Sequence, residues 1–284
     1  MTVAVTGASG QLGRLVVEAL LRRDAGPIVA IVRDPSKVAD LAARGVEVRQ
    51  ASYDDAAALD RALAGVDRLL LISGTDMGAR VAQHANVIRA AERAGVKLLA
   101  YTSIPRATDS PLILAQEHRG TEAVLAESPV PHTLLRNGWY WENFFGRVAS
   151  AVEGGVFAGA SGNGRVSAAA RADYAEAAAV VLTTDGHAGQ VYELGGDEHP
   201  TYSDLAQVIS QVSGKAVRYQ DVPEAEFVAA LESAGVPTPM ATALADADAG
   251  TGHGWLEVTD GDLHKLLGRA TTPAADAFGA ALSR

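Results

Sequence analysis

The sequence contains no cysteine. This absence excludes disulfide bonds, thiolate nucleophiles and thiolate metal ligands. Apolar runs fall well short of the roughly 18 residues of a membrane-spanning helix, and no basic segment with an apolar run behind it precedes the first strand-like segment. We therefore expect a cytoplasmic protein with no membrane association. The histidines lack metal-ligand spacing, so no metal centre is expected.

Positive charge is also scarce. There are 24 Lys and Arg residues against 34 Asp and Glu residues, which leaves a formal net charge of −10. Nucleic-acid binding needs a basic footprint, so we do not expect it. The chain has 284 residues, of which 48% are hydrophobic. That is enough to bury a sizeable core, as one domain or as two closely joined ones.

What the sequence has is a regular alternation over its first half. Aliphatic runs occur at residues 3–6, 28–33, 46–50, 68–72, 96–103 and 133–136. Segments with helical spacing of apolar residues separate them, such as Leu12, Val16 and Leu20. Such repetition predicts a parallel sheet covered on both faces. The fold class is therefore α/β, with a doubly wound Rossmann sheet.

The pattern changes after Asn137. We expect a dinucleotide-binding domain over residues 1–138, with contributions from about 171–195, and a smaller, partly interleaved α/β lobe over residues 139–284 that binds the substrate. In the lobe we expect a glycine-rich loop at 154–164, helices at 172–182, 202–213 and 224–234, and strands at 191–194 and 216–220. Asp173 is expected to cap the first of these helices.

A glycine turn follows the first predicted strand and opens the first helix. Gly7 permits a sharp turn, Gly10 leaves space for a pyrophosphate close to the backbone, and Gly13 permits close packing of helix and sheet. The helix N-terminus then presents free N–H groups to the phosphates. The alternative is an ordinary tight turn between strand and helix.

Arg33 stands at the end of the second strand, where NAD-binding chains place an acidic ribose ligand. A guanidinium there suits the 2′-phosphate of NADPH, because it forms paired, charge-assisted hydrogen bonds. Lys37 would add positive charge. The neighbouring Asp34 is an alternative ribose ligand, but its position before Pro35 favours a helix cap.

The segments TGASGQLG, IVRDPSK, LLRNGWYWEN and RADYAEAA resemble the NmrA-like, atypical short-chain dehydrogenase/reductase family, and within it the bacterial NADPH:quinone oxidoreductases. The likeness runs over nearly the whole chain. It implies an extended Rossmann domain, a small C-terminal substrate lobe, NADPH as cofactor and a small-molecule quinone as the hydride acceptor. The oligomeric state stays open, with a homodimer among the alternatives.

The resemblance also implies roles for individual residues. The pyrophosphate would lie at Gly7, Gly10, Gln11, Leu12 and Gly13, and the 2′-phosphate at Arg33 and Lys37. Loops around the nicotinamide would contain Ser73, Gly74, Thr102, Ser103 and Asn137. Asn137 would orient the acceptor or the nicotinamide ribose, and Tyr140 would lie beside the acceptor ring.

The chain departs from the family pattern at three points. The Tyr-x-x-x-Lys dyad is missing, since Pro105 stands four residues after Tyr101. His118 occupies the place of a lysine that many relatives have, which makes it the candidate for proton supply, against a helix-surface histidine. Ser52-Tyr53 stand where relatives often carry an Asp near the adenine; Asp54 or Asp55 are the substitutes, and one of the two is expected to cap the next helix.

Quinones accept hydride readily and form a weakly basic anion, so a site without the dyad fits quinone reduction. A second reading is a non-catalytic redox sensor of the NmrA type that binds NADP(H) and a protein partner. An isomerase or epimerase is weaker, because those reactions need the missing dyad. The aromatic group Trp139, Tyr140, Trp141 and Phe144 forms either an apolar wall for a flat acceptor or packing between the lobes.

Overall fold

The structure, a computed structural model, describes residues 1–283 and divides into two compact units. The first unit comprises residues 1–107, 117–136 and 172–192. The second comprises residues 108–116 and 137–171, and the described chain from residue 193 onward. The chain thus passes between the units several times.

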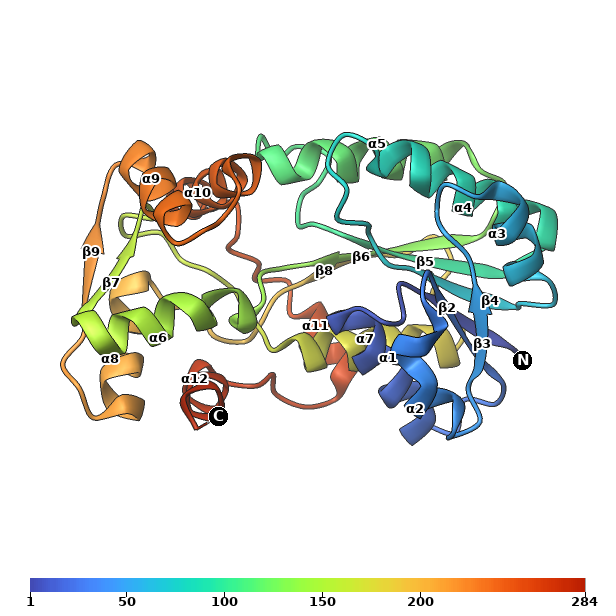
Figure 1. Ribbon diagram of the computed structural model, residues 1–284, viewed down its shortest axis with the longest axis horizontal. Helices are drawn as coiled ribbons and strands as arrows, with labels where there is room; N and C mark the ends of the chain where they lie inside the picture. The colour runs from blue at the N-terminus through green and yellow to red at the C-terminus, as the bar shows by residue number, and fades with distance from the viewer. Residues whose placement is uncertain (284) are drawn as a thin grey trace. The chain divides into compact units, whose positions relative to one another are not determined.

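A sheet of seven strands has the order β3-β2-β1-β4-β5-β6-β8 (Figure 1). The strands are β1 (Val3–Thr6), β2 (Ile28–Val32), β3 (Glu47–Gln50), β4 (Arg68–Leu71), β5 (Leu98–Ser103), β6 (His132–Asn137) and β8 (Val191–Leu194). The pairings from β3 across to β6 are all parallel. This confirms the predicted doubly wound Rossmann sheet, in which the carboxyl ends of the strands meet at one edge.

Helices cover both faces of this sheet. Helices α3 (Ala56–Leu63), α4 (Arg80–Ala94) and α5 (Ile113–Glu127) lie on one face, and α1 (Gln11–Arg22) and α7 (Arg171–Thr183) on the other (Figure 1). The short η1 (Pro35–Val38) and α2 (Ala39–Ala42) lead from β2 to β3. Strands β1, β2 and β5 are buried along their whole length, which explains their continuous apolar runs.

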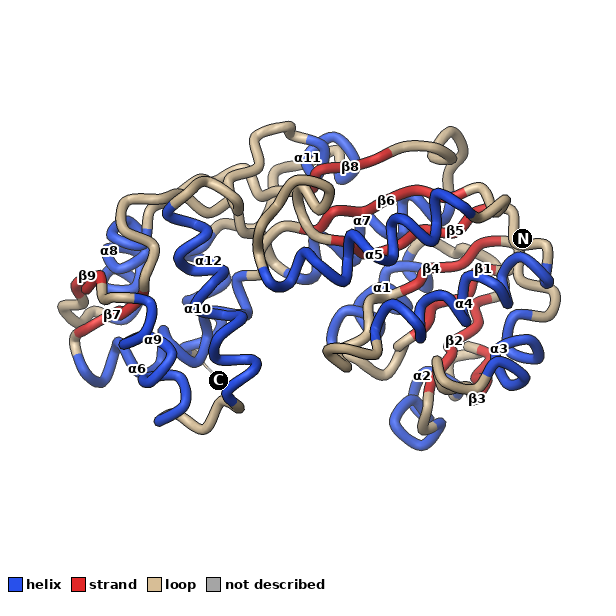
Figure 2. Tube along the Cα trace, turned by 90° about the horizontal axis from the view of Figure 1, so that it is seen from above, coloured by secondary structure: helices blue, strands red, loops and turns tan. Residues whose placement is uncertain are grey.

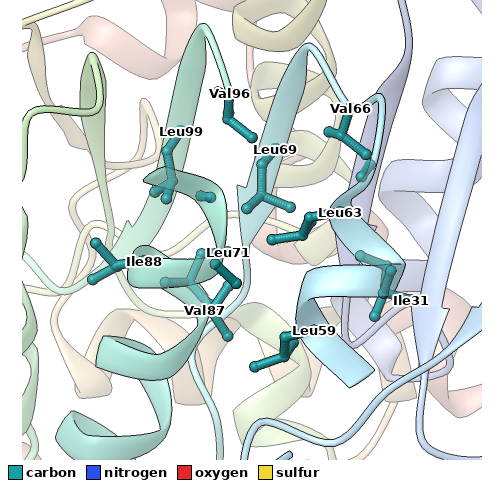
Figure 3. Packing of buried hydrophobic residues seen from close by; sticks show 14 of the residues in the cluster. Ile31, Leu59, Leu63, Val66, Leu69, Leu71, Val87, Ile88, Val96 and Leu99 are labelled. Carbon is teal, nitrogen blue, oxygen red and sulfur yellow. The ribbon is translucent and has the colours of Figure 1, made fainter. Parts of the chain in front are cut away.

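Aliphatic side chains from the sheet and from α3 and α4 form the core on one face (Figure 3). Leu69 and Leu71 of β4 and Leu99 of β5 belong to one cluster with Leu59 of α3 and Val87 of α4. Helix ends follow the sequence signals: Asp55 caps α3 through the Ala58 N–H, and Gly95 ends α4 in the left-handed conformation.

The second unit is mostly helical. It contains η2 (Trp141–Phe144), α6 (Phe145–Gly154), α8 (Tyr202–Ser213), α9 (Glu224–Ser233), α10 (Thr238–Gly252), α11 (Asp262–Leu267) and α12 (Ala274–Leu282). Its sheet consists of the parallel strands β7 (Val156–Gly159) and β9 (Arg218–Asp221). Figure 2 shows α6, α8 and α9 around this short sheet.

Two local predictions for the chain after Asn137 are wrong. The glycine-rich segment 154–164 is not all loop, because β7 lies in it and pairs with β9, which begins 62 residues later at Arg218 opposite Val156. Asp173 is not a helix cap. Helix α7 already begins at Arg171, whose N–H donates to both carboxylate oxygens of Glu142 at 3.0 Å, so Asp173 lies buried inside the first turn.

Candidate functional site

The glycine turn between β1 and α1 has the geometry of a phosphate-binding turn. Gly7 has a φ of +58°, and its carbonyl accepts a hydrogen bond from the Gly10 N–H at 2.9 Å. A Cβ at Gly13 would lie 2.3 Å from the Gly7 oxygen and 2.8 Å from Ala8 Cα. Only glycine therefore lets α1 pack against the turn. Helix α1 begins after Gly10 with no side-chain cap, which leaves its N-terminal N–H groups available to an anion.

A pocket with a cavity volume of about 270 Å³ opens at this turn. From the turn and α1 it is lined by Gly7, Ser9, Gly10, Gln11, Leu12 and Gly13. From the ends of β2, β3 and β4 it is lined by Ile31, Val32, Arg33, Ala51, Ser52, Tyr53, Asp54, Ile72, Ser73, Gly74, Thr75 and Asp76, and Gln83 of α4 completes it. The pocket thus lies at the carboxyl edge of the parallel strands, at the point where strand order reverses.

Arg33 lines this pocket, and Asp34 does not. Asp34 accepts hydrogen bonds from the Ser36 N–H at 3.0 Å and the Ser36 hydroxyl at 2.6 Å. These bonds hold its pKa below the ordinary range, and they confirm its role as the cap of η1. Lys37 is exposed on η1 and is not among the pocket residues.

At the end of β3 the predicted substitute for an adenine-binding acid is present in the pocket. Asp54 lines it, whereas Asp55 caps α3. The Gln83 side-chain amide donates to both oxygens of Asp54, at 3.1 and 3.2 Å, and to Asp76 at 3.2 Å. A carboxylate at this position is an acceptor for an amine such as that of adenine.

The chain after β4 is held by side chains that its local sequence does not mark. The Tyr53 hydroxyl lies 2.6 Å from Thr6 Oγ1 and 2.8 Å from the Ile72 carbonyl oxygen. Thr102 Oγ1 accepts a hydrogen bond from the Ser73 N–H at 2.9 Å. Thr102 therefore supports the pocket wall from β5. Tyr53 is part of the same wall, although no pattern in the sequence marks it as a pocket residue.

Ser103 and His118 form contacts on the helical side of β5. The Ser103 hydroxyl donates to Glu122 of α5 at 2.5 Å, and Glu122 forms a buried ion pair with Arg136 at 2.6 Å. His118 Nδ1 lies 2.8 Å from the Tyr101 hydroxyl, and neither residue lines the pocket.

Desolvation, together with the nearby Arg80 guanidinium, lowers the pKa of His118 to about 3. The side chain is only 9% exposed, so the alternative of a surface histidine is wrong. A histidine with this pKa is neutral at pH 7 and does not supply a proton as imidazolium. The geometry favours a packing role for His118 over the predicted catalytic one.

In the second unit, Asn137 is the last residue of β6, and Tyr140 lies three residues after it. The Asn137 side-chain amide donates to the Tyr140 hydroxyl at 3.2 Å, and the Arg171 guanidinium stacks 4.8 Å from the centre of the Tyr140 ring. Asn137 is 5% exposed, and its buried Oδ1 has no hydrogen-bond partner. A buried amide oxygen without a partner is a ready acceptor for a ligand hydroxyl or amide.

The aromatic residues that follow belong to the core of the second unit. Trp141 and Phe144 are at most 1% exposed, and Trp141 packs against Phe144 and Phe278. The Trp141 indole donates to the Thr272 carbonyl oxygen at 2.9 Å. Full burial of both side chains in their own unit excludes them as a wall open to an acceptor.

Within residues 1–283, no helix is both long enough and apolar enough to cross a membrane. The same residues contain no group of three or more histidine and acidic side chains placed to hold a metal ion. The pocket's own features fit a phosphorylated dinucleotide: a turn without side chains, an uncapped helix N-terminus and an arginine at the end of β2.

Comparison with known proteins gives the same assignment. The NmrA-like family matches residues 1–253. The chain is 52% identical to Quinone oxidoreductase 2 of Escherichia coli over 275 residues, which cover 96% of each chain. It superimposes with a TM-score of 0.96 on the crystal structure of an NADPH-dependent quinone oxidoreductase from Escherichia coli complexed with NADPH, at 51% identity and 99% coverage of both chains.

A second solved structure is also similar. The triphenylmethane reductase of Citrobacter sp. complexed with NADP(H) is 40% identical, with a TM-score of 0.94 over 98% of this chain and 99% of that one. Both likenesses extend over the two units, so they are not confined to the glycine turn that many dinucleotide-binding proteins share. By its sequence and by its fold, this chain belongs to the NmrA-like family.

Proposed function

We propose that this protein reduces quinones by two electrons with NADPH, through direct hydride transfer and without a flavin. The observation that carries the proposal is the 52% identity, over 96% of both chains, to a protein named Quinone oxidoreductase 2. The pocket at the glycine turn, with Arg33 in its lining, supports the choice of NADPH.

NADPH, when bound, supplies the hydride, and one proton from water completes the hydroquinone. The protein's part is to bind and orient the two molecules. The N–H groups of α1 and of the turn at Gly7 and Gly10 would hold the pyrophosphate. Arg33 would hold the 2′-phosphate through charge-assisted hydrogen bonds, with Lys37 adding to the positive field. Gln11, Leu12, Ser73 and Gly74 would shape the walls of the pocket.

For the reacting end we assign orientation to Asn137 and Tyr140. The free Oδ1 of Asn137 supports this assignment, because a ligand donor would satisfy it. Thr102 and Ser103 would support the cofactor site from the end of β5. Thr102 would do so through its hydrogen bond from the Ser73 backbone. An electron-poor quinone needs positioning and exclusion of water more than a strong acid, so the absence of a Tyr/Lys dyad is no obstacle.

The test is the absorbance of NADPH, followed with and without benzoquinones and naphthoquinones, using flavin-free protein well above trace contaminants. We expect quinone-dependent oxidation by the unaltered protein. The matched control is Gly10→Val, which places a side chain in the phosphate space: it should stay folded but lose both NADPH binding and oxidation. Tight NADPH binding without oxidation of any quinone would contradict this proposal and favour the hypothesis of a non-catalytic redox sensor.

We also propose a cytoplasmic location, where an NADPH-dependent reductase has its cofactor. Cell fractionation with an antibody against the chain tests it, and recovery in another compartment would contradict it. Light scattering of the purified protein decides between a monomer and the homodimer that the sequence leaves open.

A further inference from the structure

The backbone just after β4 forms part of the pocket wall, and a histidine of α4 accepts a hydrogen bond from it. Ser73 and Gly74 both line the pocket. The Gly74 N–H donates to His84 Nε2 at 2.9 Å. His84 has no exposed surface and does not itself line the pocket. It therefore contacts the wall from behind.

The hydrogen bonds around His84 specify a single tautomer. A backbone N–H can only donate, so Nε2 must be the unprotonated acceptor. In a neutral imidazole the proton is then on Nδ1, which lies 2.9 Å from Thr121 Oγ1 of α5. The Thr121 hydroxyl donates in turn to the Glu117 carbonyl oxygen at 3.0 Å, so its oxygen is free to accept from Nδ1. Every polar atom of the chain Gly74–His84–Thr121 has one consistent role.

The surroundings keep this ring in place and neutral. The rings of Tyr53 and Tyr101 contact it edge-on, with centroids at 6.0 and 5.4 Å. Burial, assisted by the neighbouring Arg80 guanidinium, lowers the pKa of His84 to about 3. A proton on Nε2 would point at the Gly74 N–H, which is itself a donor and cannot accept it.

We infer that His84 is a positioning residue for the cofactor: its Nδ1–H tautomer, which the contacts with Gly74 and Thr121 select together, fixes the Gly74 backbone in the orientation that NADPH binding requires. The inference rests on the proposed function for the identity of the ligand. It adds to that function a link from α5 through α4 to the pocket wall, made by residues that do not touch the ligand. A residue that only filled space would need none of these hydrogen-bond roles.

Two substitutions separate the hydrogen bond from the packing. The Oε1 of a glutamine reaches the place of Nε2, so His84→Gln keeps an acceptor for the Gly74 N–H. The amide of an asparagine reaches only the place of Nδ1, so His84→Asn keeps the contact with Thr121 and loses the acceptor. Both variants lose the ring. We expect His84→Asn to weaken NADPH binding about tenfold relative to His84→Gln, as for a half-buried donor left unpaired.

The tautomer provides a second pair that leaves the histidine in place. Thr121→Ser keeps the hydroxyl, and Thr121→Val removes it with little change of volume. We expect Thr121→Val, but not Thr121→Ser, to raise the KM for NADPH severalfold. Long-range ¹⁵N–¹H spectra of the full-length protein should show Nδ1 protonated in the unaltered chain and in Thr121→Ser, and a mixture of tautomers in Thr121→Val.

The outcomes are distinct from those of the proposed function. Calorimetry with NADPH alone needs no quinone turnover, so it tests His84 even if no quinone is reduced. Equal NADPH affinity of His84→Gln and His84→Asn, both folded by circular dichroism, would overturn the inference and leave His84 as packing. A proton on Nε2 in the unaltered protein would overturn it as well.

Discussion

In the first unit, the core between the sheet and helices α3 and α4 consists of alanine, valine, leucine and isoleucine side chains with one tyrosine. In the second unit, the rings of Phe144, Phe157, Tyr202 and Phe227 face the Arg147 guanidinium at 4.7–5.6 Å. Arg147 donates to Asp248 at 3.1 Å and to the Ala158 carbonyl oxygen at 2.6 Å. The core on this face of the first unit is aliphatic, whereas the core of the second unit is built around an ion pair.

The difference follows from the amount of regular sheet in each unit. Several adjacent parallel strands bury aliphatic side chains in a repeating, non-directional way. The sheet of the second unit has only two strands, and the elements of this unit meet at a hub of specific contacts around Arg147 and Asp248. Asp248 is 3% exposed and also accepts from the Tyr202 hydroxyl at 2.7 Å. A Cβ at Gly159 would lie 2.5 Å from Arg147 Nη2 and 2.8 Å from Asp248 Oδ2, so even a methyl group there would disturb the hub.

The largest expected effect comes from breaking the ion pair on one side. Arg147→Met leaves the buried Asp248 carboxylate unpaired and should lower the free energy of unfolding by about 3–5 kcal/mol. All three tryptophans, Trp139, Trp141 and Trp255, lie in the second unit, so their fluorescence in a urea titration reports on that unit. The control is Arg147→Met with Asp248→Asn, which removes the charge but keeps an acceptor for Tyr202. If the double variant is no more stable than the single one, the ion pair is not the hub.

In the aliphatic core of the first unit, the free energy of unfolding should depend mainly on the volume of the side chain that is substituted. Leu69→Ala removes a fully buried side chain from the first core and should cost about 3 kcal/mol, whereas Leu69→Met should cost less than about 1.5 kcal/mol. The contrasting change is Arg147→Lys, which keeps the charge but loses the planar fork. We expect it to cost more than Leu69→Met when urea unfolding is followed by far-ultraviolet circular dichroism, which reports on the helices of both units. The reverse order would contradict the distinction between the two interiors.

Acid should weaken the first unit before the second. His84 and His118 have a pKa of about 3 when folded, against 6.5 ordinarily, because burial and then Arg80 disfavour their charged forms. The unfolded chain binds protons more readily, so this stability is complete above about pH 6.5 and is lost as the pH falls. Each histidine should cost about 2 kcal/mol by pH 5.

Hydrogen exchange at pH 7.5 and pH 5 measures this effect segment by segment. After correction for the slower intrinsic exchange at pH 5, we expect lower protection factors in α4, β5 and α5 at pH 5, while the tryptophan fluorescence of the second unit changes less. His118→Gln removes one titrating group and should make the pH dependence shallower, with little change in quinone reduction at pH 7. An unchanged pH dependence in that variant would show that His118 does not titrate in the way its burial implies.

The smallest expected effect is a change of about tenfold in NADPH affinity or in kcat, and two variants distinguish the two quantities. Arg33→Asp removes the 2′-phosphate contact from the first unit and should weaken NADPH binding about tenfold or more, with less effect on NADH. Asn137→Ala in the second unit should lower kcat more than it lowers NADPH affinity, because it disturbs geometry at the reacting ring. Calorimetry for both dinucleotides and steady-state kinetics give the two numbers. Equal affinity of the unaltered protein for NADH and NADPH would remove the role of Arg33.

Much of the first unit could be predicted because its signals are local. The strands of the sheet agree with the predicted aliphatic runs to within two residues at each end. Asp34 caps η1 as its position before Pro35 indicates. The second unit gave weaker signals. Helix α10 is rich in alanine and has little amphipathic contrast, and the sequence did not predict it. Strand β7 contains two residues with no strong strand preference, Ala158 and Gly159, and is stabilised by pairing with β9.

The sequence by itself determined the alternation of strands and helices that marks a Rossmann sheet, the glycine turn and the place of Arg33, because strand and helix periods and turn chemistry act between residues close in the chain. Only the tertiary structure decided that His118 is buried against Tyr101, that His84 holds Gly74, and that Arg147 meets Asp248, 101 positions away. A histidine or arginine in a sequence carries no sign of its distant partner. Its burial, and with it its charge, is set by elements that come together only on folding.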